Sequence, residues 1–187
     1  MFNSGKVIAN ILRVDHAGEY GAIRIYEAQR CLARGGAPDL ITFLDRTLDD
    51  ERRHRDAFEA LMLERKVTPC RTLAVWGVGG YLLGLMTGML GRSAILICTE
   101  AVERTVHRHL DDQVRWLERR DPAISATIID IQREELEHLQ FAEIQAAPGP
   151  RTGGARTLDR GVVAVTEALI WLSTYGASSR MVRGMAD

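Results

Sequence analysis

The chain has 187 residues, of which 46% are hydrophobic and 26% are charged, and its formal net charge is −1. These values are typical of a globular protein that is long enough to bury a core, and they exclude the strong positive field that recruits nucleic acid. The three cysteines, Cys31, Cys70 and Cys98, are widely spaced and odd in number, which indicates free thiols in a reducing compartment rather than a disulfide framework.

The N-terminal residues 1–10 carry no targeting pattern. They lack the charged and apolar regions of a secretory signal and the Arg-rich, Ser-rich composition of a transit peptide. We therefore expect a protein that acts in the cytoplasm where it is made, or one whose presequence is missing from this chain.

Five prolines divide the chain into segments of helical length, and no stretch keeps the two-residue alternation of a strand. Asp121 is placed as an N-cap, with Pro122 at the first helical position. Residues 148–154 are predicted to form a linker. The sequence thus predicts one all-α domain over residues 1–187, with helices at about 7–33 (closed by Gly35-Gly36), 38–66, 93–120, 121–146 and 158–175.

The segment 72–91 is different, because its 20 residues contain no charge and six glycines. Its length is that of a membrane span, and Gly80, Gly84 and Gly88 form a stripe of small residues suited to close helix packing. So many glycines make a poor helix in water. The sequence favours a segment that lies in the membrane interface or dips in and out of it. A buried core helix is the alternative.

The two halves of the chain carry the same three residues at the same spacing. The offset between equivalent residues is always 84 (103−19, 135−51 and 138−54), and in each half a lone Glu precedes a Glu-x-x-His by 32 residues (51−19 and 135−103). Positions i and i+3 lie on one face of a helix, and a repeat at fixed offset indicates a repeated structural unit. The six candidate ligands are Glu19, Glu51, His54, Glu103, Glu135 and His138.

Four carboxylates and two imidazoles without thiolate are typical of iron or manganese, and they form the ligand set of a di-iron centre in a four-helix bundle. A solvated pair of helix faces is the alternative. By analogy with other sites of this type, we expect two irons, with Glu19 and His54 on one, Glu103 and His138 on the other, and Glu51 and Glu135 as bridges. A span through residues 72–91 would separate the two halves of such a site, which is a further reason to expect an interfacial segment.

Several neighbouring residues are candidates for supporting roles. Ligating histidines usually donate their second N–H to a carboxylate, and Asp50 and Glu134 directly precede the two predicted bridges, although both also suit a solvated helix face. His109 is a candidate for supporting the site or facing the substrate. We interpret Tyr20 and Tyr26 as core aromatics.

At this point the sequence resembles a known family. The stretch Arg13-Val14-Asp15-His16-Ala17-Gly18-Glu19-Tyr20-Gly21-Ala22 is similar to the opening signature of the demethoxyubiquinone hydroxylases, as are Ala101-Val102-Glu103, His109 with Asp112-Gln113, and Glu134-Glu135-Leu136-Glu137-His138. The similarity covers about residues 11–143 and the apolar last helix. One departure is Leu110, where relatives have a second aromatic after the histidine.

The resemblance implies a ferritin-like four-helix bundle, with two additional apolar helices (about 72–91 and 158–175) that form a membrane-facing surface. It implies a di-iron monooxygenase that inserts one atom of dioxygen into the ring of demethoxyubiquinone or its quinol, the same six residues as iron ligands, and a polyprenyl quinone substrate. The implied location is peripheral, on the cytoplasmic face of a bacterial inner membrane or the matrix face of the mitochondrial one. A lipid-binding accessory protein and a homo-oligomer are left open.

Three other functions remain at this stage. The same ligands could serve a quinol oxidase of the alternative-oxidase type, which a hydroxylated product would exclude. A ferritin-like iron store would expose polar outer faces, which residues 72–91 do not provide. A membrane-surface scaffold without iron is the third, and iron content distinguishes it.

Overall fold

The structure is a computed structural model that describes residues 4–146 and 151–174. Within these ranges the regular structure is entirely helical, which confirms the predicted all-α class. The elements are α1 (Ser4–Gly36), the short 3-10 helix η1 (Pro38–Leu40), α2 (Ile41–Glu64), α3 (Leu73–Met89), α4 (Arg92–Leu117), α5 (Pro122–Gln145) and α6 (Gly153–Thr174).

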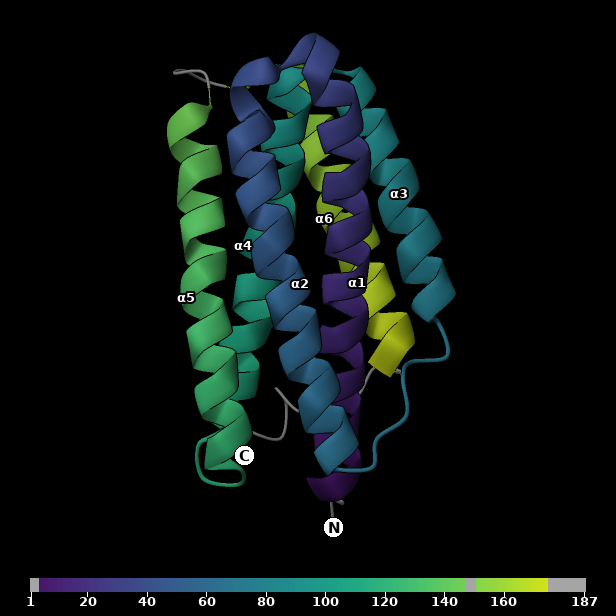
Figure 1. Cartoon of the computed structure of the whole chain (residues 1–187), viewed down its shortest axis with the longest axis vertical. Helices are drawn as coiled ribbons and strands as arrows, with labels where there is room; N and C mark the ends of the chain where they lie inside the picture. The colour runs from purple at the N-terminus through teal and green to yellow at the C-terminus, as the bar shows by residue number, and fades with distance from the viewer. Residues whose placement is uncertain (1–3, 147–150, 175–187) are drawn as a thin grey trace.

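Four of the helices form a bundle. In Figure 1, α1 and α2 run antiparallel as one hairpin, and α4 and α5 form a second hairpin beside it. The helices α3 and α6 pack outside this bundle, α3 mainly on α1, and α6 on α4 and α1. The predicted helical bundle with two additional helices is therefore present.

Apolar side chains fill both ends of the bundle. Near one end Leu12, Phe58, Leu117 and Ile128 are completely buried members of one apolar cluster, and near the other end Leu44 and Ile95 are completely buried members of a second one. Each bundle helix contributes to both clusters. The residues between the clusters are therefore shielded from water at both ends, and this is where the predicted ligands lie.

Some helix boundaries agree with the predicted ones and others differ. The carboxylate of Asp121 accepts a hydrogen bond from the Ile124 N–H at 3.3 Å, so the predicted N-cap of α5 is confirmed. By contrast, α6 begins inside the predicted linker, because Thr152 caps it by accepting from the Ala155 N–H at 3.2 Å. Gly35 and Gly36 do not close α1 but belong to it, and the Ala37 N–H still bonds to the Ala33 carbonyl at 2.8 Å. Of the predicted last helix, Tyr175 lies outside the described residues, as do residues 147–150 of the predicted linker.

The glycine stripe of α3 packs directly on α1. A Cβ atom at Gly80 would collide with the Gly21 carbonyl, and one at Gly84 with the Ile25 carbonyl. The opposite face of α3 is exposed, with Val78 at 63%, Leu82 at 59% and Met89 at 72%. The alternative of a fully buried core helix is therefore wrong.

Hydropathy sets a further limit on the helices. None of those that the structure describes is both long enough and apolar enough to cross a membrane.

The turn from α3 into α4 takes only two residues, and Gly91 makes it possible by adopting a φ of 86°.

Candidate metal centre

Each bundle helix brings carboxylates to the middle of the bundle. The lone glutamates lie on α1 and α4, whereas α2 and α5 each supply a Glu-x-x-His pair. Because positions i and i+3 share a helix face, both members of each pair point inward. The structure brings together all six predicted residues, each at most 5% exposed: Glu19, Glu51, His54, Glu103, Glu135 and His138.

The six side chains form two overlapping groups. One group contains Glu19 and His54, the other contains Glu103 and His138, and Glu51 and Glu135 belong to both. Within each group, one possible ligand atom per residue lies within 4.8 Å of all the others. Such an arrangement suits two ions that share two carboxylates.

The buried carboxylates fit cations. Burial and the nearby charge of Glu135 raise the pKa of Glu19 to about 7. Burial and neighbouring carboxylates likewise raise the pKa of Glu51 and of Glu103 well above the usual value. Oε1 of Glu51, Oε2 of Glu135 and Nδ1 of His138 are buried with no hydrogen-bond partner among the described residues. Negative charge on buried carboxylates is unfavourable unless cations neutralise it. Carboxylate and imidazole together are ligands that iron or manganese binds.

Glu135 differs from the other three glutamates. Burial alone would raise its pKa, but the imidazole of His138, with Nδ1 3.5 Å from Oε2, and the hydrogen bond with His54 lower the pKa well below the usual value. The pKa of His54 shifts in the opposite direction and is raised. Burial lowers the pKa of His54, yet the hydrogen bond with Glu135, 3.1 Å from Nδ1, and the charge of Glu19 raise it to about 9. In the absence of metal, protons on the histidines therefore partly neutralise the cluster.

Each histidine is held by an acid from the other half of the chain. Nε2 of His54 lies 3.1 Å from Oε2 of Glu134, and Nε2 of His138 lies 3.1 Å from Oδ2 of Asp50. An ionised carboxylate only accepts hydrogen bonds, so Nε2 donates and Nδ1 faces the cluster. Arg53 donates to Asp50 and, at 2.9 Å, to Glu134. One guanidinium thus connects the two acids that orient the histidines.

Tyr26 also contacts the cluster, which sequence reasoning missed. Its side chain is 1% exposed, and its hydroxyl donates to Oε1 of Glu103. Burial and the surrounding carboxylates raise its pKa well above the usual value, so it remains a neutral donor. The interpretation as a core aromatic is right for its ring, but its hydroxyl belongs to the site. The sequence places Tyr26 two helical turns after Glu19, on the same helix face, which would have indicated that it lies near the ligands.

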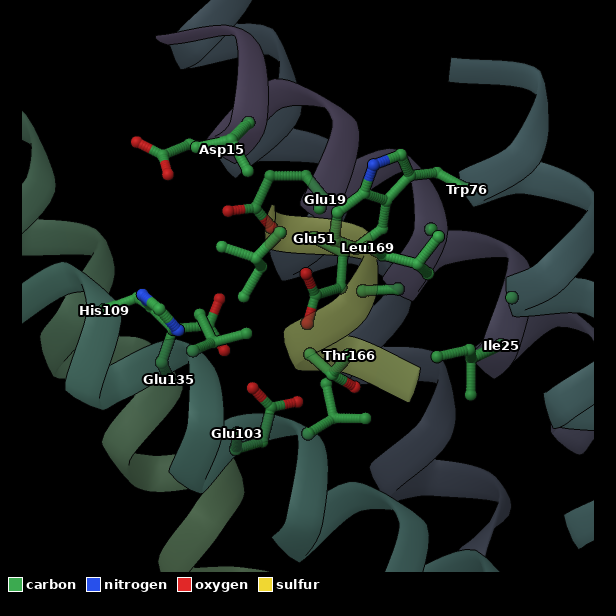
Figure 2. A pocket seen from close by; sticks show the side chains of 18 of the residues that line it. Asp15, Glu19, Ile25, Glu51, Trp76, Glu103, His109, Glu135, Thr166 and Leu169 are labelled. Carbon is green, nitrogen blue, oxygen red and sulfur yellow. The ribbon is translucent and has the colours of Figure 1, made fainter. Parts of the chain in front are cut away.

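An apolar cavity leads to the cluster. It has a volume of about 820 Å³ including its open mouth, and most of its lining residues lie on α1, α3, α4 and α6, with one each from α2 and α5. Glu19, Glu51, Glu103 and Glu135 are among its lining residues. Figure 2 shows these glutamates on one side of the space, with apolar side chains such as Ile25 and Leu169 on the other. The cluster is therefore accessible to an apolar molecule, although it is shielded at both ends of the bundle.

Two polar contacts lie along the wall of this cavity. His109 does not contact the six residues by any hydrogen bond. Instead, its Nε2 lies 3.0 Å from Glu167 on α6. Asp15, which sequence reasoning did not single out, accepts a 2.7 Å hydrogen bond from Gln113, and both side chains are buried. These contacts join α4 to α6 and to α1 around the cavity.

An all-helical bundle with a buried carboxylate and histidine cluster in its middle defines a class of helical proteins built to hold metal ions. Comparison with known proteins gives the family. Residues 6–173 match the model described as ubiquinone biosynthesis protein COQ7. The chain belongs to this family, the demethoxyubiquinone hydroxylases, as the sequence signature predicts.

Three relatives illustrate the range of the family. The chain is 36% identical over 135 residues to the NADPH-dependent 3-demethoxyubiquinone 3-hydroxylase, mitochondrial, of Mus musculus, a match that covers 70% of this chain and 61% of that protein. The protein of the same name from Dictyostelium discoideum is 35% identical over 174 residues, covering 90% and 77%. The 3-demethoxyubiquinol 3-hydroxylase of Rhodospirillum rubrum is 35% identical over 168 residues, covering 89% and 77%. The chain thus spans less than two thirds of the mouse relative.

Proposed function

We propose that this chain is a di-iron hydroxylase of ubiquinone biosynthesis that acts on the ring of demethoxyubiquinone or its quinol, with a ferritin-like bundle as its single domain. The observation that carries the proposal is the apolar cavity that ends at the buried carboxylate and histidine cluster. The names of the relatives support the substrate class. The balanced reaction places one oxygen atom of dioxygen in a ring C–H bond and releases the other as water, with two electrons and two protons from a donor.

The six buried residues would hold two irons, Glu19 and His54 at one, and Glu103 and His138 at the other. Glu51 and Glu135 belong to both groups and would bridge the ions. When bound, a pair of irons supplies redox chemistry with dioxygen that the amino acids do not provide. The chain positions the histidines through Asp50 and Glu134, and the apolar clusters at the bundle ends exclude water.

The cavity would bind the quinone by its apolar surface. Its walls include Trp76, Leu83, Val106 and Leu169, which suit a hydrophobic ring and the first part of a polyprenyl tail. The hydrocarbon tail favours apolar surroundings over water. A substrate held here would have its ring at the glutamates and its tail toward the mouth between the outer helices.

The exposed apolar side chains of α3 and α6 would attach the protein to the membrane that contains the quinone. We define this apolar face by its exposed residues, each between 42% and 72% exposed: Val75, Val78, Leu82, Met86 and Met89 of α3, with Trp171 and Leu172 of α6. Apolar patches of this kind mark membrane or protein contacts. The proposed location is peripheral, on the cytoplasmic face of a bacterial inner membrane or the matrix face of the mitochondrial one.

Oxygen labelling tests the reaction. Iron-loaded protein, supplied with a reduced demethoxyquinone analogue and isotopically labelled dioxygen, is expected to give a product with the label in the new hydroxyl. His54→Ala and His138→Ala are expected to give no labelled product, because each removes a ligand. Label that comes from water, or full turnover in either variant, contradicts the proposal. Oxygen consumption without a hydroxylated product would instead identify a quinol oxidase.

A further inference from the structure

A second cavity lies at the end of the bundle where α6 ends and α3 begins. It measures about 710 Å³ including its open mouth, and it is formed by α1, the loop before α3 and the last turn of α6. It shares no lining residue with the apolar cavity. The proposed hydroxylation does not involve this second cavity.

The charge of this second cavity is entirely positive. Arg13 and Arg71 are its only charged lining residues, and Asn10, Thr68 and Ser173 are among its polar ones. The guanidinium of Arg13 donates from Nε to the Thr68 carbonyl at 3.0 Å and from Nη1 to Asn10 at 3.4 Å. These bonds fix the side chain and leave Nη2 for a ligand. Two guanidiniums with no carboxylate in the lining select an anion, and their donor geometry suits phosphate.

The walls of the second cavity are fixed by side-chain hydrogen bonds. Trp76 donates from Nε1 to Oγ of Ser173 at 2.7 Å, and Oγ1 of Thr72 lies 3.0 Å from the same oxygen. The Sγ of Cys70 lies 2.9 Å from Oγ1 of Thr72. The loop that contains Arg71 is therefore tied to the end of α6, so the cavity is preorganised rather than a gap between loose segments.

The rim of the second cavity is apolar and belongs to the proposed membrane face. Leu172 lines the cavity and is 48% exposed, its neighbour Trp171 is 58% exposed, and Val75, one turn into α3, is 52% exposed. Lipid phosphates lie at the boundary between water and hydrocarbon, where tryptophan is also enriched. Free phosphate would gain nothing from such a rim, whereas a phospholipid places its phosphate beside apolar chains.

We propose that the cavity formed by Arg13, Arg71 and the end of α6 binds the phosphate of a phospholipid headgroup. This inference rests on the membrane face of the proposed function. A lipid phosphate held at this point would fix one end of the apolar face at the level of the headgroups. The open mouth of the quinone cavity would then have a defined depth relative to the hydrocarbon, so the site sets the orientation of the protein on the membrane.

Vesicle binding tests the proposal. The full chain and its variants are floated with phosphatidylcholine vesicles that contain phosphatidylglycerol. Arg13→Gln with Arg71→Gln is expected to weaken binding by about fivefold for each arginine removed, since a basic residue at a lipid surface has about that effect. The matched control, Arg34→Gln with Arg119→Gln, removes the same charge from two exposed positions outside the cavity, and its binding is expected to stay unchanged.

Two further measurements keep the result interpretable. Arg71→Gln alone removes a side chain that lines the cavity without a hydrogen bond to the described residues, so it is expected to weaken binding without disturbing the fold, which circular dichroism checks. Inorganic phosphate is titrated separately into the protein. If phosphate binds in the cavity but vesicle binding is the same in variant and control, the ligand is a free anion and the lipid assignment is wrong.

Equal losses in the cavity variants and the control pair would show only general charge attraction, and would also overturn the site. The hydroxylation assay uses a short-chain quinol analogue in detergent, without vesicles. A failure of that assay therefore rejects the proposed reaction, while the vesicle comparison still decides whether the cavity binds lipid.

Discussion

At the residue scale, the two halves of the candidate metal centre are not equivalent. The Tyr26 hydroxyl donates to Glu103, whereas the residue 84 positions after Tyr26 is Leu110, so Glu19 has no matching phenol. A hydrogen bond to one carboxylate oxygen fixes its orientation and draws charge from it. The two ion positions should therefore differ in affinity.

Tyr26→Phe tests this difference, because it removes the donor and keeps the ring. We expect the variant to bind one of two ferrous ions about tenfold more weakly, the lower end of the effect of losing a partner of a ligand. Anaerobic titration followed by calorimetry measures both steps. Tyr20→Phe is the control, since the Tyr20 hydroxyl makes no hydrogen bond in the described structure. Unchanged binding in Tyr26→Phe would mean that the phenol does not influence the site.

The sequence predicts the six candidate ligands because helical spacing alone places Glu51 with His54 and Glu135 with His138 on common faces. It also marks Asp50 and Glu134 as possible partners of the histidines. It does not predict that each acid reaches the histidine of the other half, 80 or more residues away along the chain. Contacts between helices depend on their rotation and separation, which local periodicity does not contain.

At the element scale, the contact of α3 with α1 depends on the absence of side chains. A Cβ at Gly84 would collide with the backbone of Ile25 and the side chain of Ala28, whereas a Cβ at Gly79 would meet nothing within 4 Å. We expect Gly84→Ala to lower the free energy of unfolding by about 1–3 kcal/mol through overpacking. Gly79→Ala should raise it by up to about 1 kcal/mol, because alanine is the better helix former. Urea unfolding of both variants checks the two signs, and equal effects would contradict the close contact.

The outer face of α3 provides a separate test of membrane attachment. Leu82 and Met89 are 59% and 72% exposed, so aspartate at both positions should leave the fold and the metal centre intact. Liposome affinity is expected to fall at least about tenfold, because two apolar contacts are lost and two charges approach the lipid. Leu63→Asp is the control, since Leu63 is 75% exposed on α2, outside the apolar face. The proposed face is wrong if both proteins bind liposomes as the unmodified chain does.

The element boundaries show what local sequence decides. Asp121 and Pro122 predict the start of α5 correctly, because a cap acts within one turn. Local sequence does not decide which residues of the uncharged segment 72–91 are covered. Leu82 and Leu85 are equivalent by sequence, but in the folded protein Leu85 is half-buried and Leu82 is exposed. An all-apolar segment has no periodic pattern that indicates which face is covered.

At the scale of the whole molecule, the buried cluster links stability to pH and metal. The pKa of Glu19 is raised from 4.5 to about 7 and that of His54 from 6.5 to about 9. A group with a raised folded-state pKa contributes stability that is complete below its unfolded pKa and is lost as the pH rises through its folded pKa. The raised pKa values of both residues therefore lower the free energy of unfolding as the pH rises from about 5 to about 9.

We therefore expect the metal-free protein to become less stable as the pH rises through this range. Glu135 has the opposite shift, but its contribution changes only at lower pH, as the pH falls through its depressed pKa. Metal ions replace the protons, so loading with ferrous or manganous ion should stabilise the protein most at the high end. Thermal unfolding with chelator and with metal measures both trends. A melting temperature of the metal-free protein that rises from pH 5 to 9 would contradict the prediction.

The crossed contacts of His54 with Glu134 and of His138 with Asp50 bear on how such a chain could have arisen. One helical hairpin, α1 with α2 or α4 with α5, carries a histidine and an acid that do not satisfy each other. Two separate copies of an ancestral hairpin would have completed the centre only on meeting, at a rate set by their concentration. Fusion into one chain would have replaced that encounter with a high effective concentration. Copies joined in this way would be free to diverge, and Tyr26 and Leu110, which occupy equivalent positions of the two halves, differ.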